Sequence, residues 1–242
     1  MSAGDTIYDL GSNNGDDLTY YLMKGLRVVA VEANPALCAH IRQIFAERLD
    51  SGQLVVINAV LTNEHHADPV TFHLHKFNHV LSQFPPPLND NPASETYRGN
   101  YHPIQLPAVT PVDVVRAYGL PHYIKIDVET YDEAILANLF AAGIRPPYIS
   151  AESHSVDVFA SLVAVGGYRR FKLVDGGTVP DRYLNHVVDT PTGQSIHSFP
   201  YHSAGPFGED IPGDWLGPND FFYHLASQRL GWKDIHAKRD DA

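Results

Sequence analysis

Polar residues able to bind a ligand or carry out chemistry stand at the ends of several strand-like apolar runs in this sequence. They are Asp9 with Gly11, Glu32, Asn58, Asp127 with Glu129, and Glu152 with His154. In an open parallel sheet, ligands bind beyond the carboxyl ends of the strands, at the point where the strand order reverses. Helix capping explains some of these residues one at a time, but the whole series favours one shared binding site.

The first of these positions opens the loop D-L-G-S-N-N-G at residues 9–15. Gly11 and Gly15 allow a tight turn in which the backbone approaches a ligand closely. The loop differs from the dinucleotide fingerprint G-x-G-x-x-G, because Asn13 stands where that pattern has its second glycine. Glu32 ends the next strand and can accept hydrogen bonds from both hydroxyls of a ribose. An adenosine with an amino-acid tail, as in S-adenosylmethionine (SAM), therefore suits this site better than a dinucleotide.

Alternating strand-like and helix-like runs must position these groups. The predicted strands are residues 6–10, 27–31, 54–60, 70–74, 123–127, 148–152 and 170–174. The predicted helices begin near residues 16, 35, 112, 131, 156 and 220. This rhythm is typical of an α/β fold in which a parallel sheet carries helices on both faces. Residues 77–107 are expected to form a long connecting loop, and the regular pattern stops at Gly176 until the last helix near residue 220.

Four motifs, in this order, resemble the FkbM-type SAM-dependent O-methyltransferases. They are YDLGSNNGDD at 8–17, RVVAVEANP at 27–35, YIKIDVE at 123–129 and PPYISAE at 146–152. The resemblance covers roughly residues 5–175 and implies a Rossmann-like class I methyltransferase fold with a mainly parallel seven-stranded sheet and long loop insertions. It also implies that SAM is bound by Asp9, Gly11, Asn13, Glu32 and Asn58. The chain departs from the pattern after D-V-E, where many members have glycine and this chain has Thr130.

Asp127 and Glu152 are expected to end neighbouring strands and to bring two carboxylates beside the methyl donor. Two oxygen ligands with open positions suit Mg²⁺, which can accept a substrate hydroxyl, and a hydroxyl needs a base, a metal ion or both. His154 is the first candidate for the base, and an exposed loop histidine is the alternative. Glu129 can join the metal ligands, while Lys125 can pair with a carboxylate. Macrocin-type sugar O-methyltransferases, which use carboxylate-bound Mg²⁺ and a nearby histidine, look similar.

Other histidines and aromatic residues are weaker candidates. His73 and His75 share one face of a predicted strand, which could bind zinc but is better explained as a solvated strand face. His102 and His202 are the alternatives to His154 as the base. Aromatic side chains in the two irregular regions suit stacking on sugars, although burial or a dimer interface explains them equally well. These are Tyr97, Tyr101, Tyr201, Trp215 and Trp232.

Composition limits the classes of function. Among 242 residues, Lys+Arg number 17 and Asp+Glu 28, so the formal net charge is -11 and a nucleic-acid partner is disfavoured. Cys38 is the one cysteine, which excludes a disulfide framework and fits a cytoplasmic protein. The N-terminus lacks a secretory signal, and no apolar run is long enough to cross a membrane.

The sequence therefore predicts one methyltransferase domain over residues 1–242. Its parts are a SAM-binding core at about 5–175, an acceptor-loop insertion at about 77–107 and a C-terminal extension at about 177–242. The expected activity is methyl transfer from SAM to a hydroxyl of a saccharide, for example a short mannoside-like oligosaccharide. A homodimer is the expected assembly. The alternatives are a polyketide or glycosylated natural product as acceptor, a nicotinamide-dependent oxidoreductase, and a non-catalytic SAM-binding protein.

Overall fold

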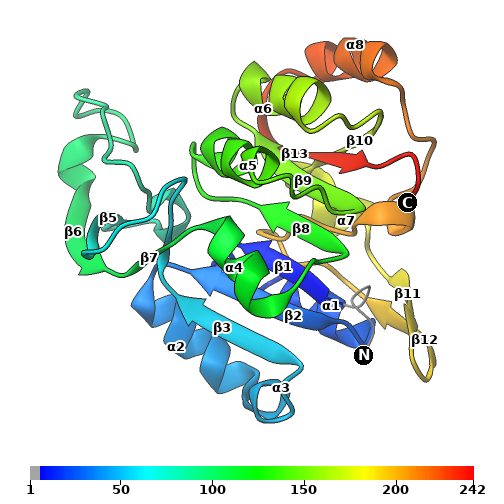
Figure 1. The fold of residues 1–242 in the computed structure, drawn as a ribbon, viewed down its shortest axis with the longest axis horizontal. Coiled ribbons are helices and arrows are strands. Elements are labelled where there is room, and N and C mark those ends of the chain that lie inside the picture. The colour runs from blue at the N-terminus through cyan, green and yellow to red at the C-terminus, as the bar shows by residue number, and fades with distance from the viewer. Residues whose placement is uncertain (1–5) are drawn as a thin grey trace.

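Seven strands form the central sheet of the computed structural model, which describes residues 6–242 (Figure 1). Continuous apolar runs make the central strands, because parallel strands covered on both faces have no solvent-facing side. In spatial order the strands are β10 (Arg170–Asp175), β13 (Gly231–Lys238), β9 (Tyr148–Ser153), β8 (Tyr123–Ile126), β1 (Thr6–Leu10), β2 (Arg27–Glu32) and β3 (Leu54–Asn58). All neighbouring pairs are parallel except those of β13, which runs antiparallel to both β10 and β9.

The chain begins in the middle of this sheet and builds it outward in two directions. From β1 it continues to β2 and β3 on one side, then returns to β8 and β9 on the other side. The strand order therefore reverses between β1 and β8, which is where ligands bind in sheets of this kind. The expectation of a class I methyltransferase fold with a mainly parallel seven-stranded sheet is confirmed.

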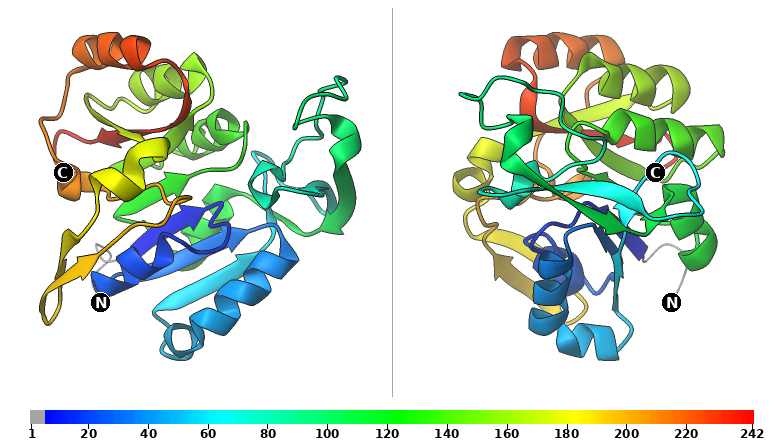
Figure 2. Two further views of the ribbon diagram at one scale, coloured as in Figure 1. Left: turned by 180° about the vertical axis from the view of Figure 1, so that it is seen from behind. Right: turned by 90° about the vertical axis from the view of Figure 1, so that its left-hand side faces the viewer.

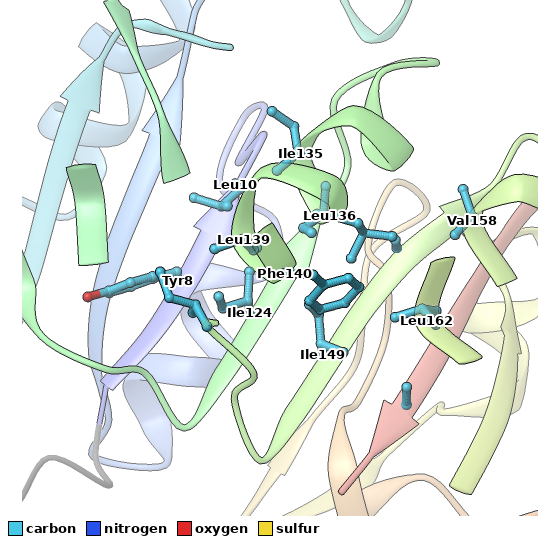
Figure 3. Packing of buried hydrophobic residues seen from close by; sticks show 14 of the residues in the cluster. Tyr8, Leu10, Ile124, Ile135, Leu136, Leu139, Phe140, Ile149, Val158 and Leu162 are labelled. Atoms are coloured by element: carbon cyan, nitrogen blue, oxygen red, sulfur yellow. The ribbon is translucent and has the colours of Figure 1, made fainter. Parts of the chain in front are cut away.

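Helices cover both faces of the sheet (Figure 2). They are α1 (Leu18–Met23), α2 (Pro35–Ile44), α3 (Ala46–Asp50), α4 (Pro111–Tyr118), α5 (Asp132–Ala141), α6 (Val156–Ala160), α7 (Val179–Arg182) and α8 (Pro218–Gln228). Alternate residues of β1 point to opposite faces, so Tyr8 belongs to the apolar layer that includes residues of α4, α5, α6 and α8, whereas Ile7 belongs to the layer that includes residues of α1 and α2. Figure 3 shows the first of these two apolar layers.

The region expected to be one long loop instead contains a strand. β5 (Val70–His75) pairs antiparallel with β6 (Tyr101–Leu106), and the short strands β4 (Val60–Leu61) and β7 (Ala108–Val109) connect this arm to the sheet. The arm projects beyond the end of the sheet (Figure 1). Pro103 weakens the strand signal of residues 101–106, but an edge strand tolerates a proline that donates no hydrogen bond.

The C-terminal region also differs from the expectation, because its last strand belongs to the central sheet. The core expected from the sequence ends near residue 175, whereas β13 lies between β9 and β10. Its sequence, GWKDIHAK, looks solvent-exposed, yet Asp234 and His236 are 3% and 2% exposed. Between β10 and β13 lie α7, α8 and the hairpin of β11 (His186–Thr190) and β12 (Gly193–His197).

Residues 1–5 lie outside the described part of the chain. The expectation about a secretory signal concerns these residues, and the expected SAM-binding core starts at the last of them. Among residues 6–242, no helix is long and apolar enough to cross a membrane.

Candidate active site

The loop after β1 is shaped by residues with positive φ. Gly11 and Gly15 have φ of +92° and +86°, and Asn13 between them has φ of +48°. Glycine adopts such a backbone without strain, and asparagine tolerates it better than most residues. The loop turns back over β2, where the Gly11 and Ser12 amides donate to the carbonyl of Val31 at 2.9 and 3.1 Å.

Glu32 connects this loop to the next one. Its Oε2 accepts the backbone N–H of Asn13 at 2.8 Å, and its Oε1 accepts that of Asn34 at 2.7 Å. Burial raises the pKa of Glu32 to about 7, although the two backbone donors favour the ionised form. A carboxylate has about four acceptor positions, so two remain for further donors such as ribose hydroxyls.

A cavity of about 360 Å³ opens at the carboxyl ends of β1, β2, β8 and β9, within the size range of small-molecule sites. Seven of the nine site residues expected from the sequence line it, and the arrangement brings them together. They are Gly11, Asn13, Glu32, Asp127, Glu129, Glu152 and His154. Ala59, Val60, Leu61, Phe72 and Phe84 give the cavity an apolar wall.

The other two expected residues, Asp9 and Asn58, do not line the cavity. Asp9 is fully buried on β1, and neither of its carboxylate oxygens has a hydrogen-bond partner. Asn58 donates from Nδ2 to the carbonyls of Glu32 and Ala33 at 3.0 and 2.8 Å. Their positions indicate that they support the surrounding loops, and the direct SAM contacts expected of them stay a prediction.

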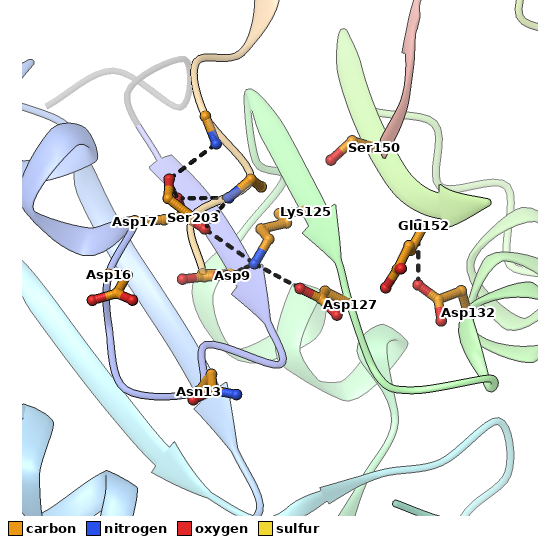
Figure 4. A network of polar contacts seen from close by, with 12 residues as sticks. Asp9, Asn13, Asp16, Asp17, Lys125, Asp127, Asp132, Ser150, Glu152 and Ser203 are labelled. Carbon is orange, nitrogen blue, oxygen red and sulfur yellow. Dashed lines mark hydrogen bonds and ion pairs between the residues drawn. The ribbon is translucent and has the colours of Figure 1, made fainter. Parts of the chain in front are cut away.

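A buried lysine organises the carboxylates at the reversal point (Figure 4). Lys125 Nζ lies 3.1 Å from an oxygen of Asp17, 3.1 Å from one of Asp127 and 3.8 Å from one of Asp9. Asp17 also accepts hydrogen bonds from the Ser203 hydroxyl and the Ala204 amide. The sequence suggests the pairing of Lys125, but Asp17 resembles an ordinary helix cap, and no local signal connects it to Ser203.

Glu152 and His154 form a pair at the end of β9. His154 Nε2 lies 3.0 Å from Glu152 Oε2, and both side chains face the cavity. Burial, together with the nearby Asp127 carboxylate, raises the pKa of Glu152 to about 8. Asp132, at the start of α5, accepts the backbone N–H of Glu152 at 3.3 Å and was not identifiable from the sequence, because an acidic residue in the first helical turn is commonplace.

The carboxylates expected to hold Mg²⁺ do not fit a preformed metal site. Asp127 is paired with Lys125, and Glu152 is paired with His154. Among residues 6–242, no group of three His, Cys, Asp or Glu side chains is arranged to hold a metal ion. The Lys125 ammonium reduces the affinity of Asp127 for a second cation, and one oxygen of Glu152 already faces His154.

The remaining histidine and aromatic candidates divide into two groups. His202 and Trp232 line the cavity, whereas His102 is exposed on β6 and lies outside the lining. His75 has a structural role, because both ring nitrogens have partners. Its Nε2 contacts the carbonyl of Glu95 at 2.9 Å, and its Nδ1 accepts a hydrogen bond from the backbone N–H of Asn78 at 2.9 Å.

A sheet of this strand order, with its cavity at the reversal point, defines a class I methyltransferase fold. The chain belongs to the FkbM methyltransferase family, because the family model described as the methyltransferase FkbM domain matches residues 9–170. No curated protein sequence matches the chain significantly.

Several solved structures resemble the chain at low sequence identity. The methyltransferase FkbM from Methylobacillus flagellatus KT has 14% identity and a TM-score of 0.47, over 72% of this chain and 40% of its own. The chain thus spans two fifths of that protein. The precorrin-6Y C5,15-methyltransferase from Geobacter metallireducens GS-15 has 10% identity and a TM-score of 0.42, covering 99% and 82%. An O-methyltransferase from Bacillus cereus, solved with S-adenosylhomocysteine, has 11% identity and a TM-score of 0.38, covering 98% and 75%.

Proposed function

We propose that this protein transfers the methyl group of SAM to a hydroxyl group of a saccharide. The observation that carries the proposal is one cavity with two chemically distinct ends. Glu32 and the glycine loop form one end, and the Glu152–His154 pair forms the other. The first end suits a ribose and its attached amino-acid tail, and the second offers a base beside the donor methyl group.

The proposed reaction is an in-line displacement. The acceptor oxygen attacks the methyl carbon while the carbon–sulfur bond breaks, and S-adenosylhomocysteine leaves as a neutral thioether. The hydroxyl proton passes to His154, whose Nε2 faces Glu152, so we assign Nδ1 as the accepting nitrogen. The neighbouring carboxylate stabilises the imidazolium that forms.

Mg²⁺ assistance is the part of the sequence prediction that the side-chain geometry does not favour. Because Lys125 pairs with Asp127 and His154 faces Glu152, no step of the proposed reaction passes through a metal ion. We therefore expect turnover to persist in EDTA. Loss of turnover that added Mg²⁺ restores would support the metal prediction instead.

Calorimetry tests the cofactor, and a panel of acceptors tests the substrate class. S-adenosylhomocysteine is expected to bind with a micromolar dissociation constant and NAD(H) is not. Binding of NAD(H) alone would favour an oxidoreductase. Methyl transfer is then measured with mono- and oligosaccharides and with macrolide-type polyketides. Turnover of polyketides but of no saccharide would contradict the acceptor proposed here.

A further inference from the structure

Carboxyl groups dominate the charge of the cavity wall. The lining carboxyl side chains are Asp16, Asp17, Glu32, Asp127, Glu129 and Glu152. Among the described residues that line the cavity, Lys125 is the one lysine or arginine, and it is already engaged by Asp17 and Asp127. SAM carries a sulfonium, an ammonium and a carboxylate, so its net charge is a single positive one. Burial and neighbouring carboxyl groups raise the pKa of Glu129 to about 8, so a cation placed beside it would favour its ionised form. An anionic acceptor would therefore be repelled.

An aromatic wall stands beside the Glu152–His154 pair. Trp232 and His202 both line the cavity, with ring centroids 6.0 Å apart, and Tyr201 lies 5.1 Å from Trp232. Trp232 is held close to β9 because Gly231 pairs with Ser153, whose hydroxyl donates to the Gly231 carbonyl at 3.0 Å. The aromatic rings and the carboxylates thus border the same part of the cavity.

The indole of Trp232 has a fixed support. It packs on Gly176, where a Cβ atom would lie 2.5 Å from the indole nitrogen, so only glycine allows this approach. Aromatic faces attract organic cations through the ring quadrupole and also stack on the C–H faces of sugars. A molecule with both a sugar-like ring and a positive charge makes use of the rings and the carboxylates together.

We propose that the acceptor carries a protonated amine, as an amino sugar does, and that Glu129 attracts its ammonium group while Trp232 stacks on its ring. This inference rests on the proposed function and specifies the charge of the substrate. A hydroxyl of the same molecule remains the nucleophile, so the methyl chemistry is unchanged.

The test compares acceptors that differ in charge alone. Glucosamine disaccharides and their N-acetylated counterparts are titrated by calorimetry into protein saturated with S-adenosylhomocysteine, and glucose 6-phosphate serves as the anionic probe. We expect the amine to bind about tenfold or more tightly than the neutral counterpart, and the phosphate to bind more weakly than either. Equal binding of amine and N-acetyl forms, binding of neither, or preference for the phosphate overturns the proposal.

Two variants and a matched control identify the groups responsible. Glu129→Gln is expected to reduce the ratio of the two dissociation constants to within about threefold, and Trp232→Leu to weaken binding of both acceptors. Glu47→Gln removes the same charge from an exposed position of α3 outside the cavity and is expected to preserve the ratio. An unchanged ratio in Glu129→Gln overturns the role of Glu129. If Glu129→Gln does not fold, Trp232→Leu still tests the cavity, because undiminished binding of both acceptors in that variant overturns the stacking role of Trp232.

The two proposals fail in different ways. If S-adenosylhomocysteine does not bind, the proposed methyltransferase function fails before the acceptor is considered. If it binds and neutral saccharides are methylated without preference for an amine, the proposed function stands and this inference fails.

Discussion

The backbone of Gly11 lies against the backbone carbonyl of Asp127, so closely that a Cβ atom at position 11 would sit 1.8 Å from that oxygen. These two residues follow β1 and β8, the strands between which the strand order reverses. The contact brings the glycine loop and the carboxylate loop together at one edge of the sheet. Glycine at position 11 is thus a condition for the two ends of the site to share a cavity.

Replacing Gly11 by alanine is expected to unfold or displace this part of the site. Overpacking and a φ of +92° together should lower the free energy of unfolding by about 3 kcal/mol and abolish binding of S-adenosylhomocysteine. Gly143→Ala is the control, because Gly143 has φ of +75° but no atom within 4 Å of its Cβ position. Thermal unfolding should show a loss of about 1 kcal/mol there. Equal losses in both variants would refute the role of the contact with Asp127.

His154 provides the test of the proposed base. We expect His154→Ala to lower kcat by about 10²–10⁴-fold, the usual contribution of general acid–base catalysis, with little change in S-adenosylhomocysteine affinity. Glu152→Gln should lower kcat as well, since it removes the charge that stabilises the imidazolium. Initial rates with a saturating acceptor measure both effects. An undiminished rate in His154→Ala would transfer the role to another residue. Of the two alternatives expected from the sequence, His202 lines the cavity and His102 does not.

Much of the fold and site follows from the sequence because the informative residues are local. Buried, mostly apolar runs identify β1, β2 and β8, and a residue at or just after the end of each strand points to the site. Gly11 and Glu32 are recognisable because the glycine loop after one strand and the acidic residue at the end of the next strand lie close together in the sequence. Together they form one nucleoside-binding motif.

Long-range contacts could not be predicted in this way. The Ser203 hydroxyl donates to Asp17, 186 positions away in the sequence, and no local pattern at either residue predicts this hydrogen bond. β13 was missed because Asp234 and His236 are polar residues that the fold buries. The fit of Asp127 and Glu152 to a metal ion likewise depends on which side chains contact them in the fold. The spacing of residues along the chain leaves these contacts open.

Glu32 should make cofactor binding depend on pH. Burial raises its pKa to about 7, and ribose hydroxyls donate to the ionised carboxylate, so protonation competes with binding. The affinity for S-adenosylhomocysteine should therefore increase about tenfold from pH 6 to pH 8 and level off above that. Calorimetry at several pH values measures the effect. Glu32→Gln should bind more weakly and lose this dependence, and a variant that keeps the same pH profile would assign it to another group.

Thr130 occupies a backbone conformation that favours glycine. Thr130 has φ of +67°, and the preceding Glu129 has φ of +41°. Thr130 stands at the position where many family members have glycine. A β-branched residue in the left-handed region is strained by about 1–2 kcal/mol, while glycine adds entropy to the unfolded chain, so Thr130→Gly should stabilise the protein by about 1 kcal/mol. Thermal unfolding should then show a Tm increase of about 2–4 °C. Thr178 is also exposed, but with φ of -107°, and Thr178→Gly should lower Tm instead. If both substitutions lowered Tm alike, the backbone at Thr130 would not be under strain.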